Sequence, residues 1–346
     1  IGDVPWSHWI APVLRWFMII GLTYLVLLTF NVLIFRQWAH HEKLQYPLAQ
    51  LPEILVNAPD DSGNAASARF FGGGAFWIGF SVSAAFLGWN VVCYTDWVPG
   101  LTPLDLNNHW GDALQDSSLT ALVHSRSAVF FTMIGLAFLI PAKVSFSIWF
   151  FYVLYLIQLQ AMVWAGFGVD ERSFPAEILY TLNFRTAEGG GALMVFALVV
   201  LYKCRNYIFC CCNTKPVEDL NPSERKELRL ASLLFLLGSI GLILTLWLGL
   251  GANLFYTIFT FVVIMIITIG LIRMVAEGGI LGLKCWFGPF HLIRSFPGMD
   301  KAWTAPTLFA PLLVYYSIIF MDIKTFIAPA MANGLKIRDD LKMERL

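Results

Sequence analysis

The stretch Arg273 to Pro289, RMVAEGGILGLKCWFGP, decides the fold. Its composition is that of a membrane-spanning helix, but a carboxylate, Glu277, directly precedes the pair Gly278 and Gly279, and Gly288-Pro289 makes a second break. A carboxylate and helix-weakening glycines are costly in lipid, so they are tolerated where the backbone packs inside protein or lines a cavity. The stretch therefore predicts a broken helix at a transport site.

The composition of the whole chain places it in the membrane. Hydrophobic residues make up 58% of the 346 residues and charged residues only 13%, whereas charged residues usually make up about 25% of a soluble domain. The mean hydropathy is +0.68. We therefore expect an all-α, polytopic transmembrane helix bundle. The 23 basic and 23 acidic residues balance, which gives no field that would attract nucleic acid.

Apolar runs mark the expected continuous spans. With the broken segments they predict about seven to nine crossings in one transmembrane domain, 1–346, which we expect to be a piece of a longer chain. The continuous spans are expected at 12–35, 70–94, 146–169, 189–202, 230–251, 254–272 and 304–321. The short connection Gly251-Ala252-Asn253 predicts that two of these spans form an antiparallel hairpin.

Two further segments are too irregular for a continuous span. In 36–55, Tyr46-Pro47 and Leu51-Pro52 should prevent a regular helix, so we expect an interfacial or re-entrant element. The run Ser127 to Ile140 is short, contains Gly135 and stops at Pro141. Such a segment is typical of a tilted span or a half-helix.

The distribution of charge predicts the orientation. The loop 203–229 carries the strongest basic cluster between spans, so it is expected in the cytoplasm, together with Arg36, Lys43, Lys143 and Arg273. The acidic loop 96–126 is then external, and 57–68 is a solvated loop by its turn-forming composition. The basic tail falls inside only if 276–296 also crosses the membrane.

Four stretches carry a resemblance to a known family. RQWAHHEKLQYPLAQLP, IGLAFLIPAKVSFSIWFF, NPSERKELRLASLLFLLG and RMVAEGGI resemble an uncharacterised bacterial membrane-protein family of planctomycete-type genomes, which is similar to the oligopeptide transporter superfamily. The resemblance implies a multi-pass protein of the bacterial inner membrane. Tyr46-Pro47 resembles the tyrosine-proline that opens a broken element in those transporters, although Leu48 and Ala49 replace the small residue and glycine that usually follow.

The broken segments supply the candidate site. Glu277 is the candidate coupling group, because a desolvated carboxyl can exchange a proton near physiological pH. Gly278 and Gly279 would let the helix unwind and free backbone groups for ions or substrate. The alternative for Glu277 is a protonated carboxyl bonded to a neighbouring helix. The remaining candidates are Tyr46 and Pro47 from the other break, Gln158 or Gln160 from the long span, and Glu188, which is expected to be solvated.

The other polar clusters do not predict a metal or a cofactor. Adjacent side chains on a helix point about 100° apart, so His40-His41-Glu42 is expected to be an interfacial polar patch rather than a metal site. Cys204, Cys210, Cys211 and Cys212 match no zinc pattern. We therefore expect neither a metal nor a cofactor.

Three functions from different classes remain open. The first is a secondary transporter of oligopeptides or other small organic solutes, coupled to protons or cations. The second is a structural subunit of a larger membrane complex. The third, a membrane-embedded enzyme, is disfavoured because neither G-x-S-x-G nor H-E-x-x-H occurs. The expected partners are the lipid bilayer, a small-molecule or peptide substrate, and a second copy or other subunits of a membrane complex.

Overall fold

A computed structural model of the chain shows two compact units. The first comprises Ile1–Tyr46 with Arg172–Asp339, and the second Pro47–Glu171 with Asp340–Leu346. Each unit is described by itself below. The structure describes residues 6–56, 72–95, 100–106, 108–109, 126–166, 184–212, 222–280, 287–295, 311–312 and 327–341.

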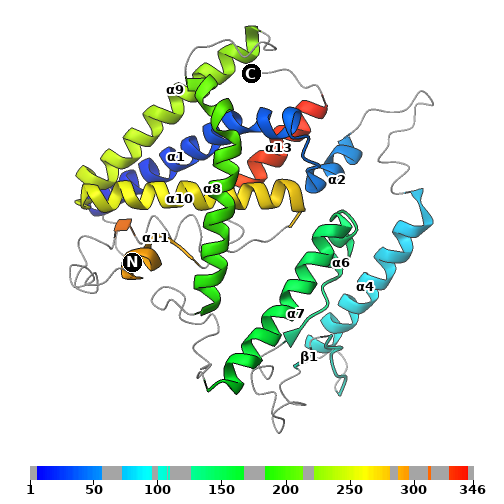
Figure 1. Cartoon of the computed structure of the whole chain (residues 1–346). Coiled ribbons are helices and arrows are strands. Elements are labelled where there is room, and N and C mark those ends of the chain that lie inside the picture. Colours follow the sequence, from blue (N-terminus) through cyan, green and yellow to red (C-terminus); the bar gives the residue numbers. More distant parts are fainter. Residues whose placement is uncertain are drawn as a thin grey trace. The chain divides into compact units, whose positions relative to one another are not determined.

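The first unit is a helical bundle. Helix α1 packs along α9, and α8 crosses α10 (Figure 1). Two π-helical segments prolong α1 and α9, and such segments are frequent at functional sites. The described elements are α1 (Trp6–Arg36), η1 (Gln37–His41), α8 (Phe184–Cys212), α9 (Pro222–Leu244), η5 (Thr245–Gly249), α10 (Leu254–Gly278), α11 (Pro289–Ser295) and α13 (Ala328–Asp340).

A tight turn reverses the chain between η5 and α10, as the sequence predicts. Gly251 has a φ of 70°, a left-handed conformation that favours glycine. The side chain of Asn253 then caps α10 by accepting a hydrogen bond from the backbone N–H of Phe255 at 2.9 Å. The cap satisfies one of the donors that a helix leaves unpaired at its start.

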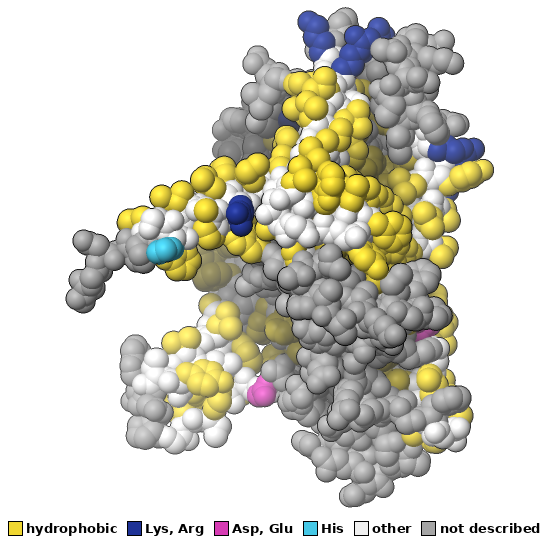
Figure 2. All heavy atoms as spheres, turned by 90° about the vertical axis from the view of Figure 1, so that its left-hand side faces the viewer, with side chains coloured by type: hydrophobic (Ala, Val, Ile, Leu, Met, Phe, Trp, Pro, Cys, Tyr) yellow, Lys and Arg dark blue, Asp and Glu magenta, His cyan; other side chains and the backbone are white. Residues whose placement is uncertain are grey.

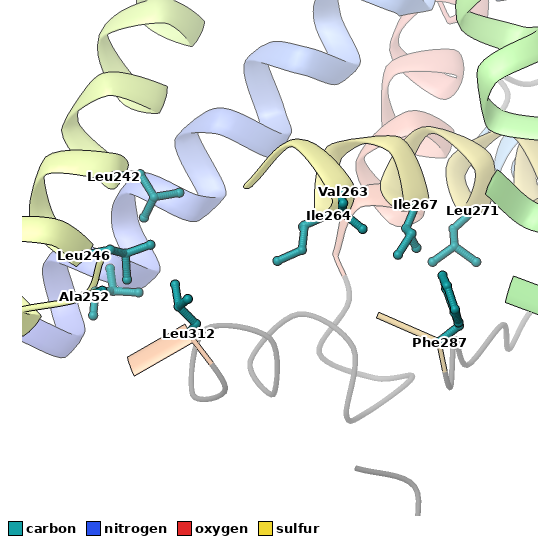
Figure 3. Packing of buried hydrophobic residues seen from close by; sticks show 10 residues of the cluster. Leu242, Leu246, Ala252, Val263, Ile264, Ile267, Leu271, Phe287 and Leu312 are labelled. Atoms are coloured by element: carbon teal, nitrogen blue, oxygen red, sulfur yellow. The ribbon is translucent and has the colours of Figure 1, made fainter. Parts of the chain in front are cut away.

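The core of the first unit lies on α10. Ile264 and Ile267 of α10 are fully buried, as is Leu242 of α9. Figure 3 shows that Leu312 packs beside Leu246 and Ala252, where α10 begins, whereas Phe287 lies beside Leu271 near the other end. Leu312, which follows α10 in the sequence, therefore packs near the N-terminal end of that helix.

The second unit contains α2 (Pro47–Val56), α4 (Gly74–Tyr94), α6 (Phe131–Ala137) and α7 (Ala142–Trp164), with a two-residue strand pair, β1 (Asn108–His109) and β2 (Arg126–Ser127). The side chain of Asn90 holds the segment after α4 by bonding both the N–H (2.8 Å) and the carbonyl (3.1 Å) of Leu104. Helix α6 is only seven residues long and ends before Pro141. The predicted interruption there is confirmed.

Six helices of the described part are long and apolar enough to cross a membrane: Trp6–His41, Gly74–Tyr94, Ala142–Trp164, Ala187–Arg205, Glu224–Gly249 and Leu254–Gly278. The all-α polytopic fold is therefore confirmed. In α10, 56% of the most apolar window is buried, against 6% in α4 and 11% in α7. Among the side chains that Figure 2 colours by type, hydrophobic ones predominate, and a group of Lys and Arg side chains lies at the top of the view. Such apolar side chains are suited to lipid.

Several predicted boundaries differ from the structure. Helix α1 starts at Trp6 rather than at Pro12, and α2 continues through Pro52. A proline removes one intrahelical hydrogen bond, and both helices tolerate that loss. Residues 273–278 form the last turns of α10 instead of opening a separate element.

The predicted loop 203–229 is also shorter than expected. Helix α8 continues to Cys212 and α9 starts at Pro222, because hydropathy marks where a helix leaves the lipid and not where it ends. Proline is favoured at a first helical position, where its missing N–H costs nothing. The loop 57–68, most of the span 304–321 and most of the acidic loop 96–126 lie outside the described residues.

Candidate functional site

The two predicted breaks meet in the first unit. Helix α10 ends at Gly278, and Gly279 caps it in the left-handed conformation with a φ of 64°. After η1 the chain is irregular until Pro47 starts α2. The backbone N–H of Tyr46 donates to the carbonyl of Ala276 at 3.0 Å. This hydrogen bond joins the two breaks, so residues from both of them lie next to each other.

Arg273 bridges two carboxylates at this junction. Its Nη1 lies 2.5 Å from Oε2 of Glu42, and its Nε lies 2.9 Å from Oε2 of Glu277. The side chains of Arg273 and Glu42 are 12% and 23% exposed, while that of Glu277 is 54% exposed. The Arg273–Glu42 pair is therefore shielded from solvent, and Glu277 is the accessible member of the three.

Uncharged side chains surround this triad of Glu42, Arg273 and Glu277. The guanidinium carbon of Arg273 lies 5.5 Å from the ring of Trp38, within the range of a cation–π interaction. The other oxygen of Glu42 accepts from Nε2 of Gln37 at 3.3 Å and from the buried thiol of Cys204 at 3.9 Å. Glu42 is thus held by η1, α8 and α10 together.

Tyr46 is the most unusual residue of the junction. It has a φ of 45°, which costs a residue with a side chain of the order of 1 kcal/mol or more. It is fully buried, and its hydroxyl has no hydrogen-bond partner in the described part of the chain. Burial raises the pKa of Tyr46 above its ordinary value, and the nearby charges of Arg273 and Glu42 act on it in opposite directions. The phenol therefore stays protonated and neutral.

The structure brings some predicted site residues together and leaves others elsewhere. Glu277, Gly278, Gly279 and Tyr46 meet at the junction, and Pro47 follows as the first residue of α2. Glu277 differs from the expected buried carboxyl, because its side chain is more than half exposed and ion-paired. Of the remaining candidates, Glu188 is exposed in α8 of the first unit, and Gln158 and Gln160 belong to α7 of the second unit, where Gln158 is exposed and Gln160 is buried.

Sequence reasoning missed Glu42 and Arg273 as members of the site. The sequence pattern places Glu42 in an interfacial polar patch, and for Arg273 it predicts only the side of the membrane. One signal was available: Arg273 and Glu277 are four residues apart, the spacing at which side chains meet on a helix. The link from Arg273 to Glu42 spans 231 positions, and no local pattern reveals it.

Ion pairs gather at the same end of the first unit. Arg36 pairs with Glu224 at the start of α9, and Arg338 of α13 pairs with Glu227 at 3.0 Å. His40 lies 3.3 Å from Asp339, also in α13. Helix α13, in the basic tail, therefore lies at the same end of the first unit as Arg36. The distribution of basic residues predicts this placement if the segment 276–296 crosses the membrane after α10. Among the described residues, no group of three or more His, Cys, Asp or Glu side chains could hold a metal ion.

Apolar helices of spanning length, together with a charged junction between interrupted segments, define a multi-pass integral membrane protein that contacts lipid. The chain belongs to a family of unknown function, DUF6785, whose model matches residues 1–346. No curated protein matches the chain, and no solved structure matches it.

Proposed function

We propose that this protein is a secondary transporter of small organic solutes, coupled to a gradient of protons or cations. The observation that carries the proposal is the junction, where two interrupted segments are joined by a backbone bond and bridged by Arg273. Secondary transporters place their binding sites at such interruptions, because unwound backbone exposes groups that bind ions and substrates. A purely structural subunit has no need of two charged side chains, Arg273 and Glu277, on an otherwise uncharged helix such as α10.

The resemblance to oligopeptide transporters supports small peptides as the first substrates to try, and the bacterial inner membrane as the location. The triad offers both signs of charge, carboxylates for an amino terminus and a guanidinium for a carboxylate. A short zwitterionic peptide has both groups. Lipid would cover the exposed apolar side chains of the helices.

Transport by the reconstituted full-length protein tests the proposal. Proteoliposomes would be given labelled di- and tripeptides and single amino acids, under an imposed pH gradient or sodium gradient. We expect uptake above the level of empty liposomes with at least one solute, and its loss when an ionophore collapses the gradient. Absence of uptake across the panel, together with partners that co-purify in fixed ratio, would favour a structural subunit instead.

Arg273→Gln gives this assay an internal reference. The substitution removes the charge that joins the two breaks, so uptake should fall to the background of empty liposomes. Arg338→Gln removes a comparable arginine from a pair outside the junction, and uptake should continue. Equal uptake by both variants would show that transport does not require the charge of Arg273 at the junction.

A further inference from the structure

The triad carries an unbalanced charge. Glu42 and Glu277 each bring one negative charge, while Arg273 brings a single positive charge that both carboxylates share. The other charged or titratable neighbours do not balance it within the cluster: Lys43 and His41 are exposed, and Cys204 is bonded to Glu42 as a thiol. The net negative charge of the triad is therefore left on Glu277, whose side chain is 54% exposed, beside the shielded Arg273–Glu42 pair.

The end of α10 adds to this field. A helix carries a partial negative charge at its C-terminus, where its last carbonyls lack intrahelical partners. Glu277 lies one residue before the last residue of α10. A carboxylate at that end is repelled by the helix and attracts cations, which are the ions that helix C-termini favour. Arg273 compensates only part of this charge.

A second and independent observation points to a ligand. The hydroxyl of Tyr46 is fully buried without a hydrogen-bond partner in the described residues, in the fields of both Glu42 and Arg273. A buried polar group without a partner loses its hydrogen bonds to water without replacing them, so native proteins rarely leave one. An oxygen atom of this kind is a ligand for alkali ions and an acceptor for ammonium groups.

We propose that the triad and Tyr46 form a binding site for one monovalent cation, either an alkali ion or the primary ammonium group of a solute. Glu277 is the accessible carboxylate that meets the cation first. Glu42, fixed by Arg273, and the Tyr46 hydroxyl complete an oxygen-lined site at the end of α10. Only the biological role of the bound cation rests on the proposed function. In a transporter, the cation would be the coupling ion or the amino group of the substrate.

Equilibrium binding to the purified full-length protein in nanodiscs tests the site without transport. One arm measures radioactive sodium, and the second measures labelled methylammonium, each with choline as the balancing ion. The loss of a charged hydrogen-bond partner typically weakens binding by about tenfold or more, so we expect at least that loss for Glu277→Gln. Tyr46→Phe should weaken binding of the same ion by about threefold to tenfold.

Glu227→Gln is the matched control, because Glu227 is also a partly buried partner of an arginine but lies outside the cluster. It should bind both ions as the native protein does. Glu277→Gln keeps the buried Arg273–Glu42 pair, and an unchanged elution volume would confirm that it is folded. Native affinity of Glu277→Gln for both ions, or no measurable binding by the native protein, would overturn the site.

The two proposals fail in different ways. Cation binding that depends on Glu277, without uptake of any solute, would retain the site and reject transport. Uptake that is indifferent to sodium and to Glu277→Gln would retain transport and reject the site. Sodium binding alone would identify a coupling ion, and methylammonium binding alone would identify a site for the substrate's amino group.

Discussion

Gly190 of α8 lies directly against the ring of Phe287. A Cβ atom at Gly190 would come within 2.1 Å of Cγ of Phe287, a distance at which one of the two residues must move. The ring has little room to do so, because it is 5% exposed and stacks on His291 with 5.9 Å between ring centroids. The middle glycine of the Gly189–Gly191 triplet therefore lets the segment before α11 pack onto α8.

Gly190→Ala should destabilise the protein. Overpacking of a filled core costs about 1–3 kcal/mol, and this should exceed the roughly 1 kcal/mol by which alanine favours a helix over glycine. Gly191→Ala is the control, since nothing lies within 4 Å of a Cβ at that position. We expect a lower midpoint of thermal unfolding in detergent for the first variant and an equal or higher midpoint for the second. Equal midpoints would contradict the contact.

Arg273→Gln should also lower stability, because it leaves Glu42 without its charged partner in a partly buried place. Removing one member of a buried ion pair costs about 3–5 kcal/mol, and partial exposure reduces this to about 2–3 kcal/mol. The double variant Arg273→Gln with Glu42→Gln should recover part of the loss, since no buried charge is then unpaired. Thermal unfolding of the four proteins of this cycle measures the coupling, and additive losses would argue against the pair.

The protonation of Tyr46 predicts a loss of stability at alkaline pH. Its pKa is raised in the folded protein by burial, so the folded state keeps a proton that the unfolded chain releases above about pH 10. Stability then falls as pH rises, by up to about 1.4 kcal/mol for each pH unit. Tyr46→Phe should remove this part of the slope between about pH 10 and 11, whereas the same change at the exposed Tyr94 should not. Identical slopes for all three proteins would contradict the buried phenol.

The orientation of the chain can be decided by labelling single cysteines. After replacement of the six native cysteines, Lys226→Cys reports on the charged end of the first unit, and Asp105→Cys reports on the acidic loop. A membrane-impermeant maleimide should label the second from outside intact cells and the first only after permeabilisation. The reverse pattern would invert the orientation that the basic residues predict.

The interruptions at Gly279 and Pro141 could be predicted from the sequence, because their causes are local, whereas the one expected at Pro52 is not present. Glycine after Glu277 allows the left-handed cap at Gly279, and Pro141 sets the boundary between α6 and α7. Both effects depend on neighbours in the chain, so they can be inferred without the fold. The extension of α8 to Cys212 was not predicted, since hydropathy falls at the membrane boundary while the helix continues.

The composition of the site could be predicted only in part, because its central contact is not local. Glu277 is recognisable as a carboxylate in an apolar run, but its actual partner, Arg273, was visible only through their spacing of four residues. Glu42 belongs to the site because η1, α8 and α10 meet there, and its position depends on the packing of those three elements. The burial of Tyr46 has the same origin.

The bond between Tyr46 N–H and the carbonyl of Ala276 belongs to the backbone, so it does not depend on which side chains surround it. Of the twenty residues, only proline lacks the donor that this bond needs at position 46. Replacing the charged or aromatic side chains of the junction would therefore leave the donor and the acceptor of this bond in place. Ligand preference could therefore change while the hydrogen bond between the two breaks is kept. Proline at position 46 would remove the bond, so selection should exclude it.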